Sequence, residues 1–300
     1  MKLAITTSYV NAQDAVYPLT RREAIKLLCE GGARYLDYNL DREFRHKKST
    51  DNTPFLTDGW RDWCREVRAL AESYGTTFVQ THTVFPNYYA DNEADRFFTG
   101  FVGRCLEATA LLGAPVTVMH PIAPPGMEYD RPGTVAVNRD YFRRQGDIAA
   151  EFGVKIAVEN MLSNRLFDGT IFKRCCTTSE ELMELVDAID HPNVGACIDV
   201  GHAHYMREHV GDAIRNCADK LIALHIDDND TFNDSHVPPY FGSLDWEAVY
   251  QALRDVHYTG GGMLECHACW KLPRELQMEA VRYLADLAEF MMAQVGGYEK

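Results

Sequence analysis

A short apolar run followed by an amphipathic segment recurs eight times along this chain, and this alternation limits the choice of fold more than any other property. Each run is four to six residues long, which suits a buried strand, and each following segment carries apolar residues at helical spacing. Strands that alternate with helices in this way form parallel sheets, because each helix returns the chain to the start of the next strand. The expected strands are Leu3–Ser8, Arg34–Tyr38, Thr77–His82, Val116–His120, Lys155–Glu159, Val194–Asp199, Leu221–His225 and Gly262–Glu265.

The segments between these runs predict helices with recognisable ends. Thr20 and Glu23 have the spacing of a capping box at the start of the first helix, and Gly31-Gly32 suits its end. Eight strand–helix pairs without a break in composition predict one domain over residues 1–300, of class α/β, folded as a (β/α)8 TIM barrel. An open doubly wound sheet is the alternative. The expected helices are Thr20–Gly31, Asp58–Tyr74, Glu93–Leu112, Asn138–Phe152, Ser179–Ile189, Gly211–Cys217, Leu244–Val256 and Glu275–Met292.

The composition argues against several classes of function. With 300 residues, of which 46% are hydrophobic, the chain can bury a large core. Its net charge of −14 argues against a nucleic-acid-binding surface, which is basic in most such proteins. No stretch approaches the ~20 apolar residues of a membrane span, and the N-terminus MKLAITTSYV lacks the apolar region of a signal peptide. Nine scattered cysteines suit free thiols in a reducing compartment, so we expect a cytoplasmic protein. We also expect a homodimer, because large barrels often pair.

Imidazole and carboxylate side chains stand at the ends of the expected strands three to eight. In a TIM barrel the carboxyl ends of the strands meet at one rim, and the chemistry of the fold is carried there. The residues at these six ends are His82, His120, Glu159, Asp199, His225 and Glu265, and His202 follows Asp199 by three residues. Because a carboxylate buried at this rim must be paired or bound to a cation, the pattern predicts a divalent-metal site.

A second group of donors lies between Lys220 and Trp246. There an apolar run breaks into His225, Asp227, Asp228, Asp230, Asp234 and His236. We expect Asp234 and His236 to be further metal ligands, whereas the three other aspartates are expected to be solvated loop charges. Two other interpretations stay open: this stretch can be an acidic surface loop, and the strand-end histidines His82 and His120 can be structural.

Short motifs lie at or after the ends of the last four expected strands in a fixed order. They are Glu159-Asn160-Met161, Asp199-Val200-Gly201-His202, Asp234-Ser235-His236, Gly242…Asp245-Trp246, and Glu265. In this order they resemble the motifs of the xylose-isomerase-like TIM-barrel sugar and sugar phosphate isomerases and epimerases. Apurinic endonuclease IV belongs to the same superfamily.

For the epimerase branch, the resemblance implies one metal ion with four protein ligands. These ligands fall on Glu159, Asp199, His225 and Glu265. The resemblance also implies that the two glutamates act as catalytic acid and base on opposite faces of the substrate. His202 is implied to contact the substrate, and we expect His82 and His120 to bind it as well. Mn²⁺ is the expected ion, with Zn²⁺, Co²⁺ and Mg²⁺ as alternatives.

The endonuclease branch implies more than one ion, because its members hold a trinuclear zinc site. The additional ligands fall on His82, His120, His202, Asp234 and His236. The chain also departs from the ketose 3-epimerases, which carry an arginine shortly after the histidine of the seventh strand. Here Asp-Asp-Asn-Asp occupies residues 227–230, so the substrate contacts of those epimerases do not carry over.

The expected function is therefore metal-dependent isomerisation or epimerisation of a sugar, keto-sugar or sugar derivative. The reaction would pass through a metal-stabilised enediolate, with Glu159 and Glu265 moving the proton. The same chemistry would support a lyase or dehydratase. A phosphodiesterase of the endonuclease IV type is the alternative, and the acidic net charge opposes it. The expected partner is a small carbohydrate, and neither a membrane nor a nucleic acid is expected.

Overall fold

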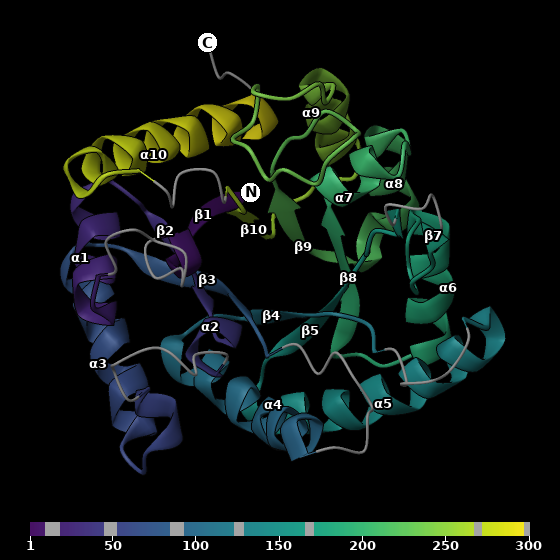
Figure 1. Cartoon of the computed structure of the whole chain (residues 1–300), viewed down its shortest axis with the longest axis horizontal. Helices are drawn as coiled ribbons and strands as arrows, with labels where there is room; N and C mark the ends of the chain where they lie inside the picture. The colour runs from purple at the N-terminus through teal and green to yellow at the C-terminus, as the bar shows by residue number, and fades with distance from the viewer. Residues whose placement is uncertain are drawn as a thin grey trace.

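The chain forms a closed barrel of parallel strands surrounded by helices (Figure 1). The computed structural model describes residues 1–9, 19–44, 53–84, 93–122, 129–165, 171–266 and 272–296. The eight strands are β1 (Lys2–Thr6), β2 (Tyr35–Asn39), β3 (Thr77–His82), β4 (Val116–Met119), β5 (Lys155–Glu159), β8 (Val194–Asp199), β9 (Leu221–Ile226) and β10 (Gly261–Leu264). They follow one another around the ring in chain order, and β10 pairs with β1 to close it. The expected TIM barrel is confirmed, and the open-sheet alternative is wrong.

The longer helices pack around the outside of the barrel, whereas the short helices α2 (Asp41–Phe44) and α7 (Val200–Tyr205) follow the ends of β2 and β8 (Figure 1). The longer helices are α1 (Arg21–Glu30), α3 (Trp60–Ser73), α4 (Glu93–Leu112), α5 (Arg131–Phe152), α6 (Ser179–Ile189), α8 (Val210–Cys217), α9 (Trp246–Asp255) and α10 (Arg274–Gly296). The expected capping box is present in α1: the Thr20 side chain accepts from the Glu23 amide, and the Glu23 side chain accepts from the Thr20 amide. Among the helices in the described ranges, none has both the length and the apolar character that a membrane crossing requires.

The largest difference from the expected elements is at α5, which begins at Arg131 rather than at Asn138. Composition alone favours a loop here, because the preceding segment is rich in proline and glycine. The side chain of Asp130 caps the helix by accepting a hydrogen bond from the Gly133 amide. Pro132 lies in the first helical turn, where its missing N–H group has no intrahelical partner to lose. The proline therefore starts this helix instead of preventing it.

Some elements have no counterpart in the sequence-based expectation. The short helix α7 starts directly after β8, and the strands β6 (Asn164–Arg165) and β7 (Ile171–Phe172) form an antiparallel pair. Two barrel strands also end one residue early, so His120 and Glu265 directly follow β4 and β10. Each of these two residues therefore stands just beyond the carboxyl end of its strand.

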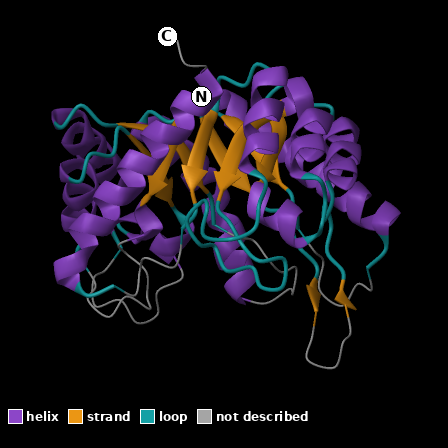
Figure 2. Ribbon diagram, turned by 90° about the horizontal axis from the view of Figure 1, so that it is seen from above, coloured by secondary structure: helices purple, strands orange, loops and turns teal. Residues whose placement is uncertain are grey.

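A layer of small apolar side chains lies inside the barrel beneath the strand ends. Side chains alternate along a strand, so the residue two positions before a strand-end residue points to the same face. Val118, Ala157, Cys197 and Ala223 stand in this position before His120, Glu159, Asp199 and His225, and they pack as one buried cluster. In Figure 2 the strands all point toward one side of the ring, so the polar side chains above this layer meet on that side.

Candidate metal centre

The strand ends bring the expected donors together at the carboxyl rim of the barrel. Within the described ranges, the donors form three groups. In each group, one ligand atom from every residue lies within 4.8 Å of those of the other members. We call the groups the paired-histidine cluster (His82, His120, Glu159), the central cluster (Glu159, Asp199, His225, Glu265) and the loop cluster (His202, Asp234, His236). Every residue that the sequence predicts as a metal ligand, catalytic group or substrate contact lies in one of these clusters.

In the central cluster, one ring nitrogen faces three carboxylates. The Nδ1 atom of His225 lies 2.9 Å from Oε1 of Glu159, 3.0 Å from Oε2 of Glu265 and 3.8 Å from Oδ2 of Asp199. A single N–H group cannot satisfy three acceptors, and Oδ2 of Asp199 is buried without a hydrogen-bond partner in the described part of the chain. One nitrogen and three carboxylate oxygens around a common point are a donor set that divalent cations bind. The residues of the central cluster therefore fit such an ion.

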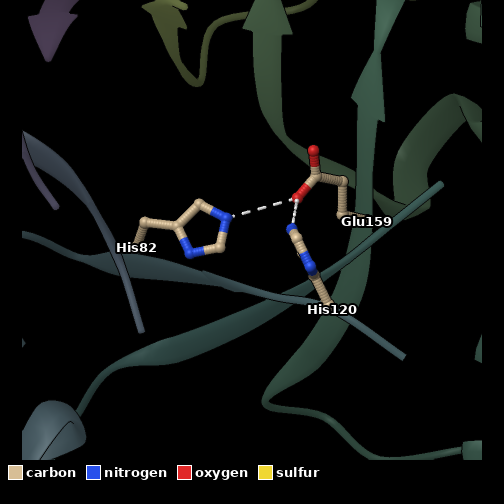
Figure 3. Close-up of side chains that lie close together, drawn as sticks. All are labelled: His82, His120 and Glu159. Atoms are coloured by element: carbon tan, nitrogen blue, oxygen red, sulfur yellow. Dashed lines mark hydrogen bonds and ion pairs between the residues drawn. The ribbon is translucent and has the colours of Figure 1, made fainter. Parts of the chain in front are cut away.

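The two oxygens of Glu159 face different clusters. Oε1 belongs to the central cluster, whereas Oε2 lies 3.3 Å from Nε2 of His82 and 3.0 Å from Nε2 of His120. Figure 3 shows both rings directed at this one oxygen while the other oxygen points away from them. The Nδ1 atom of His82 donates to the carbonyl of Thr83, so its Nε2 atom is the one available to a ligand. Glu159 can thus bridge two neighbouring sites.

The loop cluster is built by α7 and the loop after β9. The Nε2 atoms of His202 and His236 lie 3.8 Å and 3.1 Å from Oδ2 of Asp234. The Nδ1 atom of His202 lies 2.9 Å from the carbonyl oxygen of Asn160, which can accept only from a protonated nitrogen. The Nε2 atom of His202 is therefore free to act as a ligand, as in metal-binding histidines whose other nitrogen is hydrogen-bonded.

Asn160 and Asp199 fix the geometry where β5 meets β8. The Asn160 side chain accepts from the Asp199 amide at 2.6 Å and donates to the Asp199 carbonyl at 3.0 Å. Asp199 in turn caps α7, since its Oδ1 atom accepts from the His202 amide. One carboxylate oxygen thus starts the helix that carries His202, while the other faces the central cluster.

The expectation of three solvated aspartates after β9 is wrong for two of them. Asp227 and Asp228 are fully buried, and only Asp230 is exposed. The reason is that the loop folds back on itself: Asp228 pairs with Val237 through two backbone hydrogen bonds. The Asp228 carboxylate then accepts hydrogen bonds from four groups, namely the amides of Asn229, Tyr240 and Leu244 and the Trp246 indole.

The charges at the centre couple Glu159 to its histidines. Burial alone would raise the pKa of Glu159, but the neighbouring His225 and His120 more than offset this and hold that pKa well below its usual value. Burial alone would lower the pKa of His225, yet Glu159 and the other anionic groups around it raise that pKa well above its usual value. Without a cation, the two residues therefore form a buried ion pair.

Other carboxylates near the centre lack such compensation. Burial raises the pKa of Asp199 to about 6, although His202 opposes the shift. Asp37, on β2, has a pKa raised to about 6 by burial, and Asp227 has a pKa raised well above its usual value by burial and by Asp199. The sequence analysis did not identify Asp37, although an acidic residue inside the apolar run Tyr35-Leu36-Asp37 is a signal that could have done so. Carboxyl groups that are protonated in the metal-free protein would release their protons to the solvent when a cation binds.

Fold and centre together define a TIM barrel with a carboxylate–histidine site at its carboxyl rim. The family described as xylose isomerase-like TIM barrel matches residues 37–287 of the chain. The chain therefore belongs to this family.

Relatives with known names agree with this assignment. The D-psicose 3-epimerase of Enterocloster bolteae is 32% identical over 41% of this chain, and the inosose isomerase of Bacillus subtilis is 29% identical over 40% of it. The chain spans only 37% and 42% of the length of these two curated relatives.

The barrel also superimposes on solved structures. A D-psicose 3-epimerase crystallised in the presence of D-fructose matches with a TM-score of 0.72 at 18% identity, over 99% of this chain and all of that one. The IOLI protein, solved with a zinc atom, matches with a TM-score of 0.70 at 20% identity, over 98% of both chains. At these identities the likeness concerns the fold.

Proposed function

We propose that the chain is a divalent-metal-dependent isomerase or epimerase of a sugar, keto-sugar or sugar derivative. The observation that carries the proposal is the central cluster, in which four donors from four separate strand ends converge within 4.8 Å. Relatives named as a psicose epimerase and an inosose isomerase support the same class of reaction. We infer Mn²⁺ as the ion because three of the four donors are carboxylates, with Zn²⁺, Co²⁺ and Mg²⁺ as the other candidates.

The roles of the two glutamates follow from their surroundings. A bound cation would polarise a substrate carbonyl as a Lewis acid. Glu265 is the more exposed of the pair, with 15% of its side chain accessible against 1% for Glu159, so we assign to Glu265 the removal of the proton from the carbon beside the carbonyl. Return of this proton to the neighbouring carbon gives isomerisation. Delivery of a proton to the opposite face, by Glu159, gives epimerisation.

The three histidines at the rim have different access to a substrate. His120 is partly exposed, with 17% of its side chain accessible, and it can donate to a sugar hydroxyl. His202 and His82 are buried, with 8% and 2% of their side chains accessible. His202 can reach a substrate that enters between α7 and the loop after β9, whereas His82 acts on the substrate through its contact with Glu159.

Solvent exchange tests this proposal. Glu265→Gln removes the base, so we expect deuterium incorporation into ketose substrates in D₂O to fall by ~10²–10⁴-fold. Glu275→Gln, an exposed position at the start of α10, is the matched control and should exchange like the wild type. A chelator should stop exchange, and Mn²⁺ or Co²⁺ should restore it. Exchange that persists after complete metal removal would contradict the proposal. A product that has lost water would instead identify a lyase or dehydratase.

A second function is favoured by one specific observation. Glu159 presents separate oxygens to the paired-histidine and central clusters, and the loop cluster lies beside them, which suits several ions and phosphate displacement. This arrangement supports a phosphodiesterase of the endonuclease IV type, whereas the net charge of −14 opposes DNA binding. A nicking assay on a duplex with one abasic site, run together with a metal count per chain, separates the two functions.

A further inference from the structure

Asp227 is a buried carboxylate that belongs to none of the three clusters. It lies directly after β9, is fully buried, and neither of its oxygens has a hydrogen-bond partner among the described residues. Its neighbour Asp228 is equally buried but accepts four hydrogen bonds. Burying a carboxylate without a partner is unfavourable by several kcal/mol, roughly, so the position of Asp227 calls for a neighbouring group that it serves.

A basic group lies beside Asp227, namely the imidazole of His236. Oδ2 of Asp227 lies 3.6 Å from Nδ1 of His236, and the carbonyl oxygen of Glu265 lies 3.2 Å from the same nitrogen. On the other edge of the ring, Nε2 lies 3.1 Å from Oδ2 of Asp234. The two carboxylates therefore flank the imidazole on opposite sides. Because Asp227 faces Nδ1 of His236, it is too far from Nε2 to bind an ion there together with Asp234. Its negative charge instead favours a proton on Nδ1 of His236.

The packing of Asp227 leaves its side chain little freedom. A Cβ atom added to Gly201 would lie 2.0 Å from Oδ1 of Asp227, so the carboxylate is seated against the backbone of α7. The same helix carries His202. On its other side Asp227 faces His236, whose φ of 43° is unusual for a residue with a side chain. Asp227 thus contacts both elements that supply histidines to the loop cluster.

We propose that Asp227 is a positioning residue for a cation in the loop cluster. The Glu265 carbonyl oxygen, 3.2 Å from Nδ1 of His236, accepts the proton on that nitrogen, and the Asp227 carboxylate at 3.6 Å adds negative charge on the same side of the ring. Together they would leave Nε2 to face an ion that His202 and Asp234 could also hold. In metal-binding histidines a carboxylate on the far nitrogen orients the ring and increases its basicity. This inference goes beyond the proposed isomerase function, because that function requires only the ion of the central cluster.

Zinc binding by the full-length chain tests this inference. Metal-free protein is titrated with Zn²⁺ against a competing chelator, and the number of ions per chain and their affinities are measured. We expect the wild type to bind at least one ion that His236→Gln removes. Asp227→Asn should lower the affinity for that same ion by roughly 10–100-fold and leave the affinities for the other ions unchanged. Asp219→Asn makes the same charge change at an exposed site before β9, and it should bind zinc like the wild type.

A second measurement determines the protonated nitrogen in the wild type, and His236→Gln serves only to assign the signal. In ¹⁵N-histidine spectra of the zinc-loaded protein, the signal that His236→Gln removes should show a proton on Nδ1 and zinc on Nε2. A proton on Nε2 would overturn the inference, as would unchanged zinc affinity in Asp227→Asn or an equal loss at all sites. A wild type that loses no ion on His236→Gln would also overturn it, yet would leave the isomerase proposal standing. If deuterium exchange fails while the ion of the loop cluster is still bound, the isomerase proposal is contradicted and the inference about Asp227 stands.

Discussion

Asp228 organises the loop that carries the loop cluster. Its two carboxylate oxygens accept four hydrogen bonds from groups spread over residues 229–246, and three of the four donor residues are buried. Each buried donor that loses its acceptor destabilises the protein by about 1–3 kcal/mol. We therefore expect Asp228→Ala to lower the free energy of unfolding by about 3 kcal/mol or more in urea titrations. Asp228→Asn keeps one acceptor oxygen and should lose less. Equal stability of Asp228→Ala and the exposed control Asp219→Ala would contradict this role.

The burial of Asp228 and of its neighbour Asp227 could not be predicted from the sequence. The strand-end donors could be predicted because they follow from a period of two and from the rule that parallel strands end at one rim. Asp227 and Asp228 could not, because nothing in the run Asp-Asp-Asn-Asp distinguishes a buried acid from a solvated one. Their burial results from the pairing of Asp228 with Val237, which is a property of the folded loop.

At the scale of single elements, local signals predicted helix ends well when they consisted of specific hydrogen-bonding residues. Thr20 and Glu23 are the clearest case, since both reciprocal hydrogen bonds of the capping box are present. We expect Thr20→Ala to lower the free energy of unfolding by about 1 kcal/mol, because two amides at the start of α1 lose side-chain acceptors or their orientation. Glu23→Gln retains an acceptor and serves as the control. A lower free energy of unfolding for Glu23→Gln than for Thr20→Ala in urea titrations would contradict the role of Thr20 as the cap of α1.

Elements were missed where composition pointed away from the regular structure that tertiary contacts stabilise. The first turns of α5 contain Pro132 and Gly133, which together favour a loop until the cap by Asp130 is considered. Helix α7 is only six residues long, too short for a periodic pattern, and its start depends on the Asp199 side chain. Short helices at an active rim are therefore the elements that a single sequence predicts least well.

At the scale of the whole molecule, buried acids make the stability of the metal-free protein depend on pH. The pKa of Asp37 rises from 3.8 to about 6 on folding, so the folded state binds this proton more tightly than the unfolded state. Its contribution to stability is fully present below pH 4 and is lost as the pH rises to about 6, with a magnitude of about 3 kcal/mol. In Asp37→Asn this contribution is absent.

Urea unfolding of the metal-free protein at pH 4.5 and pH 7 measures this effect. The wild type should lose more stability than Asp37→Asn between the two values, because only the wild type releases the Asp37 proton in this range. Parallel pH profiles for the two proteins would contradict the shifted pKa. Addition of Mn²⁺ should then stabilise the wild type more at pH 7 than at pH 4.5, since the ion competes with protons for the carboxylates.

The closure of the barrel determines when a metal ion can first be enclosed. Strand β10, which leads into Glu265, is hydrogen-bonded on one side to β9 with His225 and on the other to β1. During synthesis on the ribosome, Glu159, Asp199 and His225 leave the exit tunnel before Glu265, and β1 has no partner on its outer edge until β10 arrives. The fourth donor of the central cluster and the last seam of the barrel therefore appear together. A cation captured earlier would stay open to exchange with the surrounding solvent, whereas one captured after this step would be held by the completed ring.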